Sequence, residues 1–96
     1  MAMPMNFGEA LEAIKIGKKV QRAGWNGKGM WIALTPGCTF EYEEARAGAA
    51  THLAKERPGA ITIGGHIDMR AADGSLVIGW LASQTDMLSN DWQVVE

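Results

Sequence analysis

The sequence predicts a small α+β protein, in which hairpins build an antiparallel sheet, an N-terminal helix packs across it, and a helical insertion occupies the middle of the chain. Three observations support this fold class. An amphipathic helical pattern stands near the N-terminus, and an Asn-Gly turn separates two apolar runs. An Asp-Gly turn then separates two further strand-like runs in the last third.

The first element is predicted to be a helix from about Phe7 to Ile16. Asn6 is a suitable N-cap, and Glu9 follows it at the spacing of a capping box. Gly17 supplies the left-handed residue that commonly ends a helix. The apolar positions fall at helical spacing, and we expect this stripe to pack on the sheet: Phe7, Ala10, Leu11 and Ile14.

The glycine-rich segment 24–31 is predicted to organise the sheet, because it joins two strand candidates through a turn. Asn26-Gly27 is a strong hairpin signal, since primed turns need positive φ angles that Asn tolerates and Gly adopts without cost. Strands are predicted at residues 19–23 and 30–34. The second of them is a nearly continuous apolar run, which predicts a strand covered on both faces.

Residues 40–58 are predicted to form a helical insertion, with the helix itself running from about Phe40 to Glu56. Acidic residues suit its first turn, and Arg57-Pro58-Gly59 ends it. Its apolar stripe is weak, which is more typical of a cover or an assembly contact than of a catalytic element.

The last third of the chain is predicted to return to strands. Asp73-Gly74 marks a second hairpin, and Ser83-Gln84-Thr85-Asp86 is a capping-box pattern that predicts one helical turn. The strands are predicted at residues 60–63, 66–70, 75–80 and 91–95.

Length and composition predict one domain, residues 1–96, with a loose leader at residues 1–5. A chain of 96 residues that is 47% hydrophobic supports a packed core, but a lone domain of this size is marginally stable, so self-association is expected. A formal charge of −2 gives no basic footprint for nucleic acid. The single cysteine, and the lack of a long apolar segment or secretory signal, predict a cytoplasmic protein with no membrane partner.

No constellation in the sequence predicts catalysis, a metal site or a bound cofactor. His52 and His66 stand in different elements, without a carboxylate or cysteine at metal-ligand spacing. Cys38 follows a Pro-Gly turn with no neighbouring base, which is typical of a small buried or semi-exposed thiol rather than a nucleophile. We therefore expect the protein not to be an enzyme.

Trp25 and Trp31, near the two ends of the glycine-rich segment, each have two interpretations. An indole can fill the core while its N–H finds a partner, or it can offer a stacking surface for a flat ligand such as a nucleobase. We favour the core for Trp31 and for Trp92, and both interpretations stay open for Trp25.

Several blocks of the sequence resemble a small phage and prophage family, the second family of Thoeris anti-defence proteins. The blocks occur in the family's order and at both ends of the chain. Residues from about 38 to 65 depart from the pattern, because they form an insertion that does not align with the shorter members. The matching blocks are 6–11, 17–20, 22–31, 80–87 and 91–92.

The resemblance implies a sponge, a homo-oligomer thought to be a tetramer that captures a glycocyclic ADP-ribose immune signal without cleaving it. Some members are also thought to hold cyclic dinucleotides at separate sites. A ligand of this type needs aromatic platforms for its base, polar side chains for its hydroxyls, and donors for its pyrophosphate. The candidate ligand-binding residues are Phe7, Arg22, Trp25, Asn26, Lys28, Trp80, Ser83, Gln84, Thr85 and Asp86.

Each candidate residue also has a structural alternative. Phe7 can fill the core, Asn26 can serve only the turn, and Ser83 with Asp86 can only cap a helix. Two other functions stay open beside the sponge: an enzyme that hydrolyses the same nucleotide, and a phage structural or protein-interaction module with no small ligand.

Overall fold

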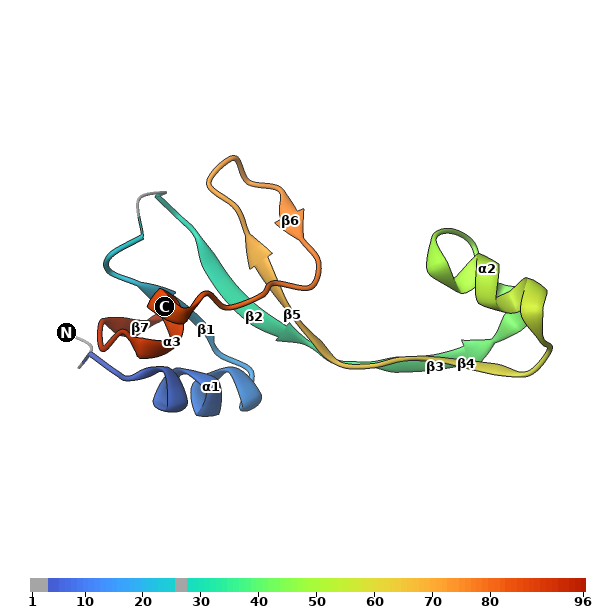
Figure 1. The fold of residues 1–96 in the computed structure, drawn as a ribbon, viewed down its shortest axis with the longest axis horizontal. Helices are drawn as coiled ribbons and strands as arrows, with labels where there is room; N and C mark the ends of the chain where they lie inside the picture. The colour runs from blue at the N-terminus through green and yellow to red at the C-terminus, as the bar shows by residue number, and fades with distance from the viewer. Residues whose placement is uncertain (1–3, 26–27) are drawn as a thin grey trace. The chain divides into compact units, whose positions relative to one another are not determined.

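The computed structural model describes residues 4–25 and 28–96, so the predicted Asn26-Gly27 turn lies outside the described residues (Figure 1). The chain divides into two compact units. We call Met1–Thr35 with His66–Glu96 the sheet unit, and Pro36–Gly65 the middle unit. Their helices and antiparallel strands confirm the predicted α+β fold class.

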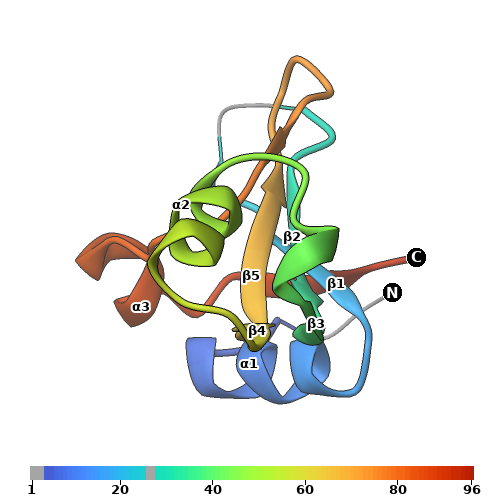
Figure 2. The same ribbon diagram turned by 90° about the vertical axis from the view of Figure 1, so that its right-hand side faces the viewer.

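The sheet unit contains a five-stranded sheet in the order β6-β5-β2-β1-β7 (Figure 1). Figure 2 shows its central strands β5, β2 and β1 from another side. Its register places Val20 opposite both Ile32 and Val94, and Ile32 opposite Met69. Because side chains alternate along a strand, these four residues share one face of the sheet. The strands are β1 (Lys19–Arg22), β2 (Trp31–Thr35), β5 (His66–Arg70), β6 (Leu76–Val77) and β7 (Trp92–Val95).

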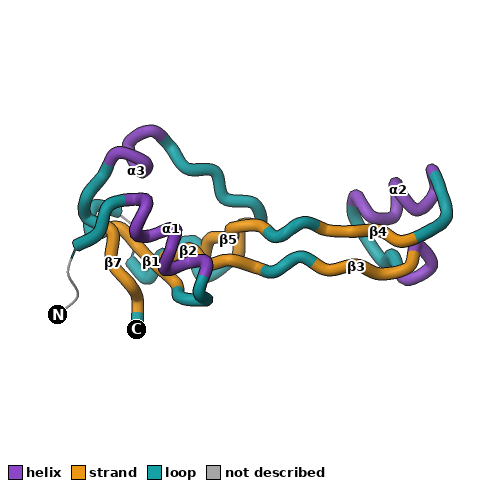
Figure 3. The backbone as a smooth tube through the Cα atoms, turned by 90° about the horizontal axis from the view of Figure 1, so that it is seen from below, coloured by secondary structure: helices purple, strands orange, loops and turns teal. Residues whose placement is uncertain are grey.

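Helix α1 (Phe7–Lys15) packs across this apolar face, beside β1, β2 and β7 (Figure 3). The predicted capping box is confirmed, because the Glu9 N–H donates to Asn6 Oδ1 at 2.8 Å and the Asn6 N–H donates to Glu9 Oε1 at 3.0 Å. Gly17 follows the helix with a φ of 95°. The core between helix and sheet consists of Ala10, Ala13, Ile14, Val20, Ile32 and Trp92.

Two details of the sheet unit differ from expectation. Strand β2 is not covered on both faces, because Ile32 is buried while Trp31 is only half-buried and Leu34 is 39% exposed. Met5, expected in a loose leader, exchanges backbone hydrogen bonds of 2.8 and 3.1 Å with Trp92. This isolated bridge holds the chain against β7 before α1 begins.

The region after β5 follows the predicted pattern in part. The strand predicted at residues 75–80 is confined to Leu76–Val77, because the chain leaves the extended conformation at Gly79, whose φ is 83°. Gly74 has a φ of 91° in the turn between β5 and β6, and its N–H donates to the Ala71 carbonyl at 2.9 Å. Helix α3 (Gln84–Leu88) begins after Ser83, whose Oγ accepts the Asp86 N–H at 3.0 Å. This contact confirms the predicted N-cap.

The middle unit contains a two-stranded antiparallel sheet of β3 (Cys38–Glu41) and β4 (Ala60–Ile63). A short 3-10 helix η1 (Tyr42–Glu44) and helix α2 (Ala49–Glu56) follow β3. The predicted helix from Phe40 to Glu56 is therefore wrong over its first part, because Phe40 lies in β3 opposite Ile61. Pairing between distant strands has overridden the local helical pattern.

Candidate ligand-binding site

Four aromatic side chains from distant parts of the sequence form one cluster in the sheet unit. The Trp25 ring meets Trp92 edge-on at 5.3 Å between ring centroids and Trp80 at 6.3 Å. The Phe7 ring lies 5.4 Å from Trp92 and 6.5 Å from Trp80. Trp92 is fully buried, whereas the other three are half-buried. The cluster thus presents partly exposed aromatic surface around a buried centre.

Asp86 fixes the orientation of two of these indoles. The Trp25 Nε1–H donates to Asp86 Oδ1 at 3.1 Å, and the Trp92 Nε1–H donates to the Asp86 backbone carbonyl at 2.9 Å. Since a buried indole N–H needs a partner, these contacts let both rings pack without losing a hydrogen bond. They also tie α3 to the aromatic cluster.

Arg22, at the end of β1, joins Asp86 to a second carboxylate. Its Nη1 donates to Asp86 Oδ1 at 2.8 Å, and its Nε and Nη2 donate to the two oxygens of Asp91 at 2.8 and 3.3 Å. The side chains of Arg22 and Asp86 are only 13% and 14% exposed. This paired geometry is the strong form of an arginine–carboxylate contact.

The Asp91 carboxylate also holds the start of the glycine-rich segment, because Oδ2 accepts the Gly24 N–H at 2.8 Å. A Cβ at position 24 would lie 2.9 Å from both Arg22 Nη2 and Asp91 Oδ2. Glycine at this position therefore leaves room for the ion pair.

The protonation states of this network follow from its contacts. Hydrogen bonds from Arg22 hold the pKa of Asp91 below its usual value, and those to Asp91 and Asp86 raise the pKa of Arg22. Burial raises the pKa of Asp86, but hydrogen bonds from Arg22, Trp25 and Ser83 outweigh it and leave the pKa lowered. The network holds one positive and two negative charges at neutral pH.

The structure brings five of the candidate residues into this arrangement: Phe7, Arg22, Trp25, Trp80 and Asp86. Ser83 caps α3, and Gln84 and Thr85 are exposed in its first turn. Lys28 is exposed in the glycine-rich segment, and Asn26 lies outside the described residues. Both interpretations of Trp25 find support, because its indole is anchored by Asp86 and its ring is only half-buried.

Sequence reasoning did not identify Asp91 as a member of the site. It is 69 positions from Arg22, and the two meet because β1 pairs with β7 in a register that sets Arg22 opposite Trp92. Sequence reasoning also did not identify a second carboxylate, Asp68. This residue is buried, and its Oδ1 lies 2.7 Å from His66 Nδ1. No local pattern distinguishes these residues from ordinary surface carboxylates.

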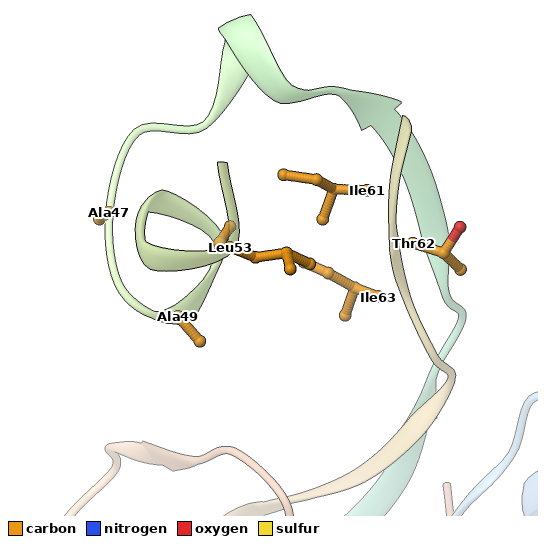
Figure 4. Close-up of a pocket in the computed structure, with 7 residues that line it drawn as sticks. Ala47, Ala49, Leu53, Ile61, Thr62 and Ile63 are labelled. Carbon is orange, nitrogen blue, oxygen red and sulfur yellow. The ribbon is translucent and has the colours of Figure 1, made fainter. Parts of the chain in front are cut away.

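The middle unit has a concavity of its own, with a volume of about 390 Å³, between α2 and β4 (Figure 4). Figure 4 shows Leu53 reaching from the helix towards Ile61 and Ile63 on the strand. No candidate residue lines it. The lining residues are Ala47, Ala49, Ala50, Leu53, Ile61, Thr62 and Ile63.

Within residues 4–25 and 28–96, no group of three or more His, Cys, Asp or Glu side chains is placed to hold a metal ion. In the same described part of the chain, no helix has the length and apolar character needed to cross a membrane.

The fold and site define a small α+β protein with a half-buried aromatic cluster braced by an arginine–carboxylate network. A family model described as a Tad2-like, Thoeris anti-defense 2-like domain matches residues 5–95, and the chain belongs to this family. It is 37% identical over 95 residues to Thoeris anti-defense 2 of Bacillus phage SP01, with 99% of each chain covered. Family membership supports a phage anti-defence role, and the family description names no catalysis.

Proposed function

We propose that this protein is a phage anti-defence sponge that binds a cyclic ADP-ribose-type immune nucleotide and sequesters it without cleaving it. It would act in the cytoplasm of the infected bacterium and inhibit Thoeris defence. Membership of the Thoeris anti-defense 2-like family supports the biological role. The chemistry of the sheet unit supports the kind of ligand.

The observation that carries the proposal is the anchoring of Trp25 beside a carboxylate. The Nε1–H of Trp25 is held by Asp86 Oδ1 while its ring stays half-buried, so the indole is oriented before any ligand arrives. A preoriented aromatic surface binds a nucleobase at a lower entropic cost than a freely rotating one. Trp80, 6.3 Å from Trp25 between ring centroids, supplies a second half-buried surface.

Carboxylates suit the ribose part of such a ligand, because an ionised carboxylate accepts hydrogen bonds from hydroxyl groups. The Arg22 and Trp25 side chains both donate to Asp86 Oδ1, and we assign Oδ2 to a ribose hydroxyl. The exposed side chains of Gln84 and Thr85 lie in the same short helix. They supply further polar groups for the sugar or the base edge.

The pyrophosphate requires positive charge, and Arg22 is already engaged by Asp86 and Asp91. We therefore assign Arg22 to orienting the two carboxylates, and Lys28 to the phosphates. Lys28 is exposed in the same glycine-rich segment that carries Trp25. Asn26 is assigned to the polar edge of the ligand from its sequence position alone.

We further propose that the protein works as a homo-oligomer, with a tetramer as the expected form. Apolar side chains of the sheet unit are exposed on and after edge strand β6, and Leu81 is 89% exposed. An unpaired edge strand with exposed apolar residues is a suitable surface for association. Light scattering should give a mass several times 10.3 kDa, and a mass of 10.3 kDa at micromolar concentration would contradict association.

Binding is tested by thermal unfolding with and without the cyclic ADP-ribose-type nucleotide. Ligand at 100-fold its dissociation constant should add about 2.7 kcal/mol to the free energy of unfolding. Linear ADP-ribose is the matched control, and a cyclic dinucleotide is the second probe. No shift with either cyclic nucleotide would favour a structural or protein-interaction module.

A further inference from the structure

A buried carboxylate outside the candidate set stands at the centre of β5. Asp68 is 5% exposed, and among the described residues it is the one charged or polar residue that is buried. Burying a charge is costly unless hydrogen bonds replace the lost water, so a carboxylate in this position has a structural or functional reason.

Three donors satisfy Asp68, and they come from three segments of the sheet unit. The Thr35 hydroxyl at the end of β2 donates to Oδ2. The Gly79 N–H donates to Oδ1 at 2.9 Å, and His66 Nδ1 donates to the same oxygen at 2.7 Å. Because an ionised carboxylate only accepts, the His66 proton in this contact resides on Nδ1.

The Gly79 contact fixes the backbone directly before Trp80. The next N–H, that of Trp80, donates to the Ile67 carbonyl at 2.7 Å, so two consecutive residues are held by β5. Gly79 has a φ of 83°, a left-handed conformation that favours glycine, and a Cβ there would meet no atom within 4 Å. Conformation rather than space therefore requires glycine.

Ile78 is 64% exposed, so apolar packing does little to hold the residue directly before Gly79. The hydrogen bonds from the Gly79 and Trp80 N–H groups to β5 therefore fix the backbone at Trp80, while its ring packs against the core. Trp80 in turn lies 6.3 Å from both Trp25 and Trp92 and 6.5 Å from Phe7, between ring centroids.

We propose that Asp68 is a positioning residue for the ligand site: oriented by Thr35 and His66, its carboxylate holds the Gly79 N–H and so presents Trp80 to the nucleotide. This inference rests on the proposed function for its effect on binding. Its effect on Trp80 itself is independent of any ligand.

The ligand-free test uses protein labelled with fluorotryptophan and observed by fluorine NMR, with each of the four Trp resonances assigned by a Trp→Phe variant. Asp68→Ala should shift or broaden the Trp80 resonance and leave that of Trp31 in place. Asp68→Asn, which keeps an oxygen acceptor for Gly79, should restore most of the wild-type signal. An unchanged Trp80 resonance in Asp68→Ala would overturn the proposal.

Binding is measured on the same variants with the cyclic ADP-ribose-type nucleotide. Asp68→Ala should weaken affinity roughly 10-fold, the lower part of the range for a lost stacking platform. Ile14→Val, a core truncation in α1, controls for lost stability and should leave affinity unchanged. If wild-type protein does not bind the nucleotide, the proposed function fails, whereas the fluorine result still decides the positioning role.

If Asp68→Ala does not fold, hydrogen exchange of the Gly79 amide in Asp68→Asn and wild type provides a second test. Amide exchange at Gly79 should be faster in Asp68→Asn than in wild type, because a neutral amide oxygen accepts more weakly than a carboxylate. Exchange at Val20, in the core of β1, serves as the internal reference. If the Gly79 N–H of wild type exchanges as fast as an unprotected amide, the Asp68 carboxylate does not hold it and the proposal is overturned.

Discussion

The two units of this protein hold their elements together by different means. In the sheet unit, Arg22 bridges two carboxylates and Asp86 anchors two indoles, so charged and aromatic groups are locked to one another. In the middle unit, α2 and β4 line an apolar concavity of about 390 Å³. Among the described residues of that unit, Ile61 is the only buried hydrophobic side chain. The comparison places preorganised polar chemistry in the sheet unit and loose apolar packing in the middle unit.

The largest effect should come from removing the central cation. Arg22→Ala leaves Asp86 and Asp91 facing each other without a counter-charge, and we expect the free energy of unfolding to fall by about 3 kcal/mol. Urea unfolding measures this loss. Arg57→Ala in the middle unit is the matched control, because the Arg57 side chain is exposed and donates to the Ala60 carbonyl at 3.3 Å, with no carboxylate partner among the described residues. An equal loss of unfolding free energy in the two variants would contradict the proposed difference between the units.

This difference also explains where sequence reasoning succeeded. The Asn6–Glu9 capping box and the Ser83 cap depend on residues three positions apart, so local spacing predicts them. The helix predicted from Phe40 failed because the pairing of Phe40 with Ile61 is invisible in a local window. Local propensity is a weak guide where long-range pairing decides.

The site was predictable in its parts but not in its connections. Trp25, Trp80 and Asp86 were identified from a glycine-rich turn, a resemblance and a cap. Arg22 is predicted as a ligand-binding residue, whereas its side chain pairs with Asp86 and Asp91, which are 64 and 69 positions away. Only the strand register and the placement of α3 bring those carboxylates to the guanidinium, and neither can be inferred from spacing.

Trp25→Ala tests the aromatic surface of the sheet unit. We expect nucleotide affinity to fall by about 1 to 3 kcal/mol, the range for a lost stacking platform. Calorimetry measures the affinity, and light scattering checks that the assembly survives. Trp31→Ala is the matched control, since Trp31 is half-buried but forms no aromatic ring pair with the cluster among the described residues. Equal losses for both variants would mean that the site is misplaced.

Acid should weaken the sheet unit through its carboxylates. The folded-state pKa values of Asp86 and Asp91 lie below the ordinary value of 3.8, so their stabilising contribution is complete above that pH and is lost as pH falls through the folded values. Melting temperature should therefore stay level between about pH 5 and 7 and drop below about pH 4. In Asp91→Asn the drop should be smaller, and an identical drop would contradict the assignment.

The smallest effect on function should come from the middle unit. Leu53 is half-buried between α2 and β4, so Leu53→Ala should lower stability by about 1 kcal/mol, less than for a fully buried leucine. Nucleotide affinity should not change. A loss of affinity comparable to that of Trp25→Ala would bring the middle unit into the binding site.

The central claim is that the sheet unit captures a nucleotide and leaves it intact. Wild type and Asp86→Asn are each incubated overnight with the cyclic ADP-ribose-type nucleotide, heated to denature the protein, and the released ligand is separated by chromatography. We expect intact cyclic nucleotide from both, with Asp86→Asn retaining less before heating because its affinity falls by about 1.5 to 3 kcal/mol. A linear product released from wild type would contradict the account and identify an enzyme.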